Sequence, residues 1–239
     1  MTWDINERDE NGLTALHRAA RFDDADRIED LLARGADPHA LDRDGRTALH
    51  MVAWSGQGRT IKTLLDKGLA ANAPSHSGRR PIHEAAWSGN IPAMMALLDG
   101  GADFAAVTND KRTALHFAAE SGGVKAVTTL LNRGADVEAA TVEGLRPLHE
   151  AATWSAEAVE ALLRAGARID SISASGRTAL HFAAECGNAR IVKLLLEAGA
   201  DPAKRTASGW SAADVARAKG HAAVATTIVA ASAGKNVSR

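Results

Sequence analysis

Six histidines with regular spacing are the residues of this chain that could do chemistry. Each follows a Leu or Ile, and successive ones are 33 residues apart, or 32 at the last step: His17, His50, His83, His116, His149 and His181. Imidazole is a common zinc ligand and general base. Residues spaced by one repeat lie roughly 10 Å apart, however, whereas the ligands of one zinc lie about 2 Å from it. We therefore expect structural histidines, with no bound metal and no cofactor.

Other catalytic signatures are incomplete. His83-Glu84 and His149-Glu150 each begin like the HExxH zinc-protease motif, but neither has the second histidine. Cys186 is the single cysteine, and the carboxylate beside it should raise its pKa, so we expect an inert thiol. An enzyme or small-molecule binder would have to use Glu84, Glu150 or one of the histidines in a tryptophan-lined pocket. This is the alternative to a non-catalytic function.

Tryptophan and arginine supply the candidate binding residues. Trp54 and Trp87 each follow a repeated histidine by four positions, and Trp154 follows one by five. Arginines recur directly after a turn glycine or its replacement. Trp and Arg are enriched at the energetic centres of protein interfaces. The predicted partner-binding residues are Trp54, Trp87, Trp154, Arg43, Arg46, His76, Arg79, Arg112, Phe22 and Trp210.

The elements that position these residues follow the same period. Each interval holds a turn with glycine, a short Ala-rich helix such as 113–120, and an amphipathic helix such as 191–196. Glycines that should end the first helix in a left-handed cap are Gly56, Gly89, Gly122, Gly187 and Gly220. Lys111 replaces the turn glycine once, and one interval lacks a residue between His149 and Gly166.

The phrase Asp44-Gly45-Arg46-Thr47-Ala48-Leu49-His50, followed by Leu64-Leu65 and Gly68, resembles the ankyrin repeat. The resemblance implies an all-α ankyrin-repeat solenoid of helix–turn–helix units joined by β-turn loops. It also implies histidines that hydrogen-bond neighbouring turns, and a concave groove in which partners bind.

This resemblance predicts one domain over residues 9–231, after a remnant of a preceding repeat at 1–8 and before a tail at 232–239. The expected repeats are 9–41, 42–74, 75–107, 108–140, 141–172, 173–205 and 206–231. The core should hold the leucine pairs Leu31-Leu32, Leu64-Leu65, Leu97-Leu98, Leu130-Leu131, Leu162-Leu163 and Leu194-Leu195.

Charge is nearly balanced overall, at a formal −1, but it is unevenly distributed. Residues 1–41 are acidic, 42–82 are basic, and the last predicted helix, 222–231, carries no charge. The balance argues against nucleic-acid binding, and no apolar run is long enough for a membrane span. No secretory signal is visible, so we expect a cytoplasmic protein.

Together these patterns predict a monomeric, non-catalytic scaffold. A protein or peptide would bind in the groove of repeats two to five. Over repeats two to four this partner should be acidic and apolar, to meet the arginines and tryptophans.

Overall fold

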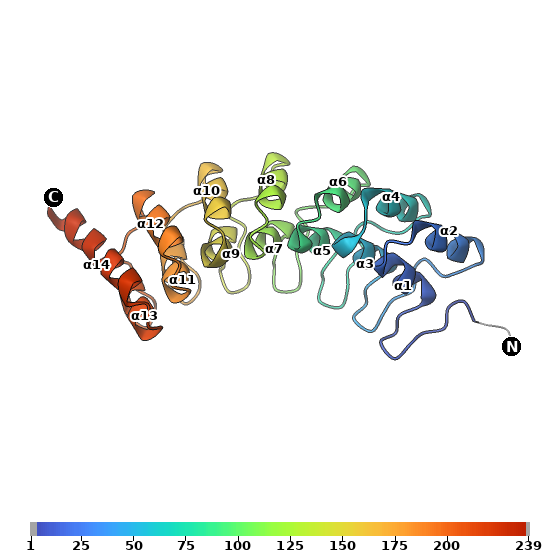
Figure 1. The fold of residues 1–239 in the computed structure, drawn as a ribbon, viewed down its shortest axis with the longest axis horizontal. Helices are drawn as coiled ribbons and strands as arrows, with labels where there is room; N and C mark the ends of the chain where they lie inside the picture. The colour runs from blue at the N-terminus through green and yellow to red at the C-terminus, as the bar shows by residue number, and fades with distance from the viewer. Residues whose placement is uncertain (1–3, 238–239) are drawn as a thin grey trace. The chain divides into compact units, whose positions relative to one another are not determined.

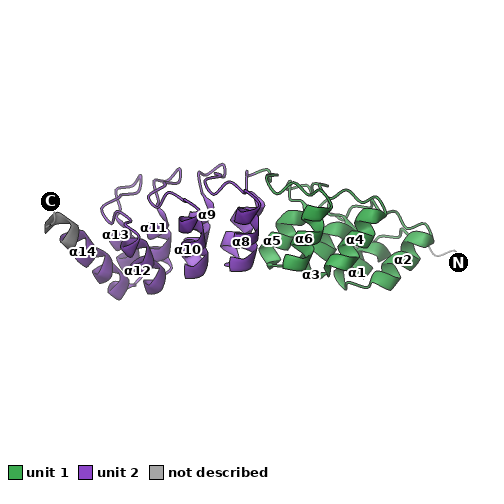
Figure 2. Cartoon of the chain, turned by 90° about the horizontal axis from the view of Figure 1, so that it is seen from above, with its two compact units in different colours: residues 1–109 green, residues 110–239 purple. Residues whose placement is uncertain are grey.

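The computed structural model describes residues 4–237, and in that part the chain forms fourteen α-helices and no strand. The chain divides into two compact units, residues 1–109 and 110–239 (Figure 2). Unit 1 contains α1 (Ala15–Arg21), α2 (Ala25–Ala33), α3 (Ala48–Ser55), α4 (Gly58–Asp66), α5 (Pro81–Ser88) and α6 (Ile91–Asp99). Unit 2 contains α7 (Ala114–Glu120), α8 (Val124–Asn132), α9 (Pro147–Trp154), α10 (Ala156–Arg164), α11 (Ala179–Glu185), α12 (Ala189–Glu197), α13 (Ala212–Ala218) and α14 (Ala222–Val237).

Each unit is built from helix pairs in two layers (Figure 1). In unit 1, the first helices of the pairs pack on one another, α1 on α3 and α3 on α5, while α4 packs on α6. In unit 2, α7, α9, α11 and α13 form one layer, and α8, α10, α12 and α14 form the other. The first helices are rich in buried alanine, whose small side chain allows this close stacking.

One leucine of each predicted pair forms the centre of the core. Leu31, Leu64, Leu97, Leu130, Leu162 and Leu195 are fully buried. Their partners in the predicted pairs are only half-buried. In the sixth pair the buried member is Leu195 rather than Leu194, because Leu195 follows the buried Leu162 by 33 residues and so holds the same place in its helix.

The turns between helix pairs stack through their backbones. His76 N–H donates to Asp44 O at 2.9 Å in unit 1, and Ala174 N–H donates to Glu143 O at 2.8 Å in unit 2. Gly45 has a φ of +76° at such a turn, and a Cβ there would lie 2.5 Å from the His76 ring. Lys111 adopts the same left-handed conformation without being glycine, at φ +63°.

The turns inside the helix pairs differ from one another. Gly89 is a left-handed cap as predicted, and Gly122, Gly187 and Gly220 also have positive φ. The prediction for Gly56 is wrong, since its φ is −86°. In the short repeat, Ser155 both ends α9 and begins α10, so the missing residue is the left-handed one.

The two ends of the chain add detail to the predicted boundaries. Asn6 Oδ1 accepts a hydrogen bond from Asp37 N–H at 2.8 Å, as Asn72 does from Asp103, so this residue acts like its counterpart in a later repeat. At the other end, α14 continues to Val237 through most of the predicted tail. Residues 1–3, 238 and 239 lie outside the described part. None of the described helices is long and apolar enough to cross a membrane.

Candidate functional site

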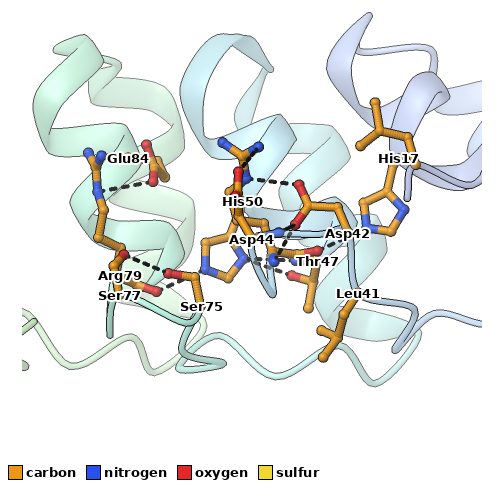
Figure 3. Close-up of polar contacts among 12 residues, drawn as sticks. His17, Leu41, Asp42, Asp44, Thr47, His50, Ser75, Ser77, Arg79 and Glu84 are labelled. Atoms are coloured by element: carbon orange, nitrogen blue, oxygen red, sulfur yellow. Dashed lines mark hydrogen bonds and ion pairs between the residues drawn. The ribbon is translucent and has the colours of Figure 1, made fainter. Parts of the chain in front are cut away.

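Both ring nitrogens of each of the six repeated histidines form hydrogen bonds. In each, the backbone N–H three residues earlier donates to Nδ1 at 2.9–3.2 Å. Each Nε2 lies 2.9–3.2 Å from a backbone carbonyl oxygen further along the chain. The surroundings of one of them, His50 with Thr47, are drawn in Figure 3. This arrangement requires a neutral ring with the proton on Nε2.

Two kinds of helix start give the histidines different acceptors. Where a threonine precedes the helix, its hydroxyl also lies 2.9–3.0 Å from Nδ1, and Nε2 reaches the carbonyl 29 residues later. Where Arg80 or Arg146 replaces the threonine, the histidine contacts Ala106 O or Ser171 O, 23 or 22 residues later. The four repeats in which a threonine precedes the first helix therefore show the hydrogen bonds between neighbouring turns that the resemblance implies.

Burial lowers the pKa of all six histidines. For His50, His83 and His116 the pKa falls to about 4. It is also lowered for His17, His149 and His181. Because these rings are neutral and already hydrogen-bonded at both nitrogens, they hold the fold together. Within residues 4–237 there is no group of three His, Cys, Asp or Glu side chains that could hold a metal ion.

Two adjoining cavities form a groove along unit 1. The larger has a volume of about 470 Å³, and the smaller has about 250 Å³. The larger is lined by Asn11, Leu13, Arg21, Asp42, Arg43, Asp44, Arg46, His50, Met51, Trp54, Ser55 and Glu84. The smaller shares Asp44, Arg46 and Glu84 and adds Ser75, His76, Ser77 and Arg79. We call the residues that line these cavities the unit 1 groove.

A tryptophan pair lies near the ends of α3 and α5, and one of its members, Trp54, lines the larger cavity of the groove. The rings of Trp54 and Trp87 meet edge to face, with centroids 5.1 Å apart. The Arg79 guanidinium lies over the Trp87 ring, 4.6 Å from its centroid. Trp54 remains 45% exposed and Trp87 37% exposed, so the pair presents a fixed aromatic surface to solvent.

Two of the predicted groove arginines, Arg46 and Arg79, already pair with carboxylates of the chain. Arg46 binds Asp42 at 2.9 Å and Asp44 at 2.7 Å. Arg79 Nε lies 3.2 Å from Glu84 Oε1, and Figure 3 shows the two side chains turned toward each other. Their charges are thus largely compensated before any partner arrives.

Arg112, the one predicted arginine of unit 2, is also paired. Arg112 binds Glu120 at 2.7 Å and Glu150 at 3.1 Å, and it covers the Phe117 ring at 4.4 Å. Arg177 repeats this pattern, with Glu185 as its ion-pair partner and the Phe182 ring 4.3 Å away.

Three further predicted aromatic residues are Phe22 in unit 1 and Trp154 and Trp210 in unit 2. Phe22 caps α1 and is 80% exposed, and Trp154 ends α9 and is 70% exposed. Trp210 lines a cavity of about 240 Å³ in unit 2 together with Arg177 and Lys219. Its backbone carbonyl also accepts the hydrogen bond from His181 Nε2.

Sequence reasoning missed several residues that line the groove, among them Arg21 and Met51 in the larger cavity. The signal for Arg21 was its position, since it follows His17 by four residues, as Trp54 follows His50. Met51 follows its histidine directly, at the position of Glu84 in the next repeat.

Of the carboxylates considered for catalysis, Glu84 is buried and Glu150 is half-buried, and both are paired with an arginine. Burial raises the pKa of Glu84, and burial raises that of Glu150 to about 7 against the opposing effect of Arg112. The two belong to different units. The Cys186 thiol is exposed at the helix end, and its pKa is raised by partial burial and by Glu185.

Comparison with known proteins identifies the repeat. A family model described as ankyrin repeats (3 copies) matches residues 16–108, 82–173 and 148–239. The crystal structure of the human ASB11 ankyrin repeat domain is similar, with a TM-score of 0.81 and 26% sequence identity. The match covers 90% of this chain and 98% of that one. No curated protein matches the chain significantly.

Ankyrin repeats are generally protein–protein interaction modules and are typically non-catalytic. The family match covers nearly the whole chain, and the helix pairs and histidine bonds have the geometry that the repeat requires. The chain therefore belongs to the ankyrin repeat family.

Proposed function

We propose that this protein is a non-catalytic interaction scaffold whose unit 1 groove binds a peptide or protein surface. The observation that carries the proposal is the half-exposed Trp54–Trp87 pair beside a cavity of about 470 Å³. Exposed aromatic surface costs free energy in a free protein and marks binding sites. A pair held edge to face loses little conformational entropy when a partner covers it.

The groove favours a partner with apolar side chains and some carboxylates. Arg46 and Arg79 are paired internally, so carboxylates of a partner must compete with Asp42, Asp44 and Glu84. We therefore assign most of the binding energy to the tryptophans, and to the arginines we assign steering and specificity. Arg43 and His76 contribute from the stacked turns.

The absence of catalysis is part of the proposal. A general base needs a free lone pair near its substrate, and both nitrogens of each repeated histidine are already hydrogen-bonded. Glu84, the one carboxylate of the alternative that lines the unit 1 groove, faces Arg79 and is buried.

The test is a binding selection from an unbiased peptide library displayed on phage, followed by affinity measurement. The Trp54→Ala/Trp87→Ala variant should lose the selected peptides, and Trp154→Ala should retain them as a matched loss of one exposed tryptophan in unit 2. Circular dichroism checks that all variants are folded. If the double variant binds as tightly as the wild type, the groove assignment fails. The predicted monomeric state, cytoplasmic location and lack of nucleic-acid binding stay predictions.

A further inference from the structure

The cavity that Trp210 lines in unit 2 lies between α11 and α13, which pack side by side (Figure 1). Ala218 follows Asp214 by four positions, as Trp54 follows His50, so a methyl group takes the place of an indole ring on α13. In the turn before α13, Trp210 follows the turn glycine, where other turns carry an arginine. The last repeat therefore has its large ring on the turn and a small side chain on the helix below.

The size of this cavity favours side chains of a partner protein. Its volume is about 240 Å³, below the roughly 300–1,000 Å³ of pockets that enclose small-molecule ligands. Trp210, Val215 and Ala218 give it an apolar part. The Trp210 side chain is 46% exposed, and tryptophan is a residue type that anchors protein partners. The cavity therefore suits one or two side chains of a protein or peptide.

The polar part of the lining has a surplus of positive charge. Arg177 and Lys219 share one carboxylate, that of Glu185, and Lys219 Nζ lies 3.0 Å from Glu185 Oε1. The hydrogen bond from Arg177 lowers the pKa of Glu185, so this carboxylate is ionised at neutral pH and compensates only one of the two cations. The other described residues that line the cavity are uncharged. In the larger cavity of unit 1, by contrast, three carboxylates balance three arginines.

The segment that forms one side of the cavity has the same sign of charge. Residues 204–221 contain one acidic residue, Asp214, and four basic residues, Lys204, Arg205, Arg217 and Lys219. Asp214 lies 2.9 Å from Arg217 and 3.9 Å from Arg205. All four basic residues are exposed. Such a surface attracts an anionic partner and disfavours a cationic one.

We propose that this cavity, which we call the unit 2 pocket, is a second protein-binding site. It takes a partner segment in which an Asp or Glu adjoins a large apolar side chain. The apolar side chain packs on Trp210 and Ala218, and the carboxylate binds Lys219. The Lys219 ammonium has three N–H donors, so it can accommodate a second carboxylate while it stays beside Glu185. The unit 2 pocket shares no residue with the unit 1 groove, so the two sites are independent.

The test uses the full chain with the aromatic surface of the unit 1 groove removed, Trp54→Ala/Trp87→Ala, as bait for a phage-displayed random peptide library. We expect enriched peptides that carry Asp or Glu next to a large apolar residue. Adding Trp210→Ala should weaken their binding about tenfold or more, since it removes the anchor. Adding Lys219→Met should weaken it several-fold and reduce its dependence on salt.

Two matched variants control for the loss of side chains elsewhere in unit 2. Trp154→Ala removes another exposed tryptophan, and Lys193→Met removes an exposed lysine of α12. Both should bind the enriched peptides like the bait. Circular dichroism checks the fold, and Lys219→Met decides the outcome should Trp210→Ala fail to fold.

Three results would overturn the unit 2 pocket as a binding site. These are a selection that enriches no peptide, enriched peptides without an acidic residue, and enriched peptides that bind the Trp210→Ala and Lys219→Met variants as tightly as the bait. None of them affects the proposed function, which depends on peptides selected with the wild type and lost in Trp54→Ala/Trp87→Ala.

Discussion

The residues four places after the repeated histidines differ in side-chain type between the two units. In unit 1 the residues four places after the repeated histidines are Arg21, Trp54 and Trp87, and in unit 2 they are Glu120, Thr153 and Glu185. The two glutamates of unit 2 are neutralised by Arg112, Arg177 and Lys219. At equivalent positions, unit 1 thus presents exposed tryptophan rings and unit 2 presents glutamates that are paired with cations. The repeat determines the position of these side chains in the helix, but it does not determine their residue type.

The largest expected effect is the response of both units to acid. The pKa of His50 and His83 in unit 1 and of His116 in unit 2 is about 4, below the ordinary 6.5. Their contribution to stability is complete above pH 6.5 and is lost as the pH falls toward 4, at about 1.4 kcal/mol per pH unit for each histidine. Glu150 acts in the opposite direction, because its raised pKa of about 7 favours the folded state in acid.

Each unit holds three histidines whose pKa is lowered by burial, so both units should lose stability as the pH falls below 6.5. Backbone NMR spectra recorded between pH 7 and pH 4 can follow the signals of both units in one sample. A unit whose stability did not change over this range would contradict the assignment of its histidines as buried and neutral.

Core truncation should affect each unit separately. Leu64 in unit 1 and Leu162 in unit 2 are both fully buried. Changing either to Ala should cost about 2–5 kcal/mol, from lost apolar burial and the cavity left behind. Because repeats contact only their neighbours, hydrogen exchange should accelerate mainly in the unit that carries the substitution. Equal acceleration in both units after either change would argue for a single cooperative block.

Removal of one tryptophan from each unit compares the two surfaces directly. Trp87→Ala should cost about 2–4 kcal/mol in binding of a groove peptide, because it removes half of the aromatic pair. Trp154→Ala should leave that affinity unchanged, since the ring stands in unit 2. Titration calorimetry measures both, and thermal melts serve as the control. A sharp fall in the melting temperature of Trp87→Ala with unchanged affinity would place this ring in the core.

The smallest effect concerns two residues that stand in left-handed conformations. Lys111 in unit 2 has φ +63°, and Asp23 in unit 1 has φ +55°. Lys111→Gly should stabilise the protein by about 0.5–1 kcal/mol, since relief of backbone strain exceeds the entropy cost of glycine. Asp23→Gly should bring no gain, because Asp tolerates this conformation and its Oδ1 accepts a hydrogen bond from Gln57 N–H at 3.1 Å. Chemical denaturation of both variants measures the difference, and a loss of stability in Lys111→Gly would contradict it.

The sequence predicted the helix pairs and the structural role of the histidines because both follow from a strict period. It could not predict which carboxylate neutralises each arginine. Arg112, for example, pairs with Glu150, a residue 38 positions away, and that pairing depends on the packing of successive repeats. The length of α14 was also missed, since the helix continues through Gly234, a residue that weakens a helix without ending it. Arg21 was missed because its residue type differs from the tryptophans at the equivalent positions of the next two repeats.

The histidine bonds also make each repeat observable by itself. A buried Nε2–H that donates to a carbonyl exchanges slowly with water, so each of the six rings should give a separate low-field proton resonance. Four of these bonds reach a carbonyl 29 residues later, so their signals report on the junction between one turn and the next. The chain thus carries its own set of spectroscopic reporters, which can follow the order in which its junctions open without any attached label.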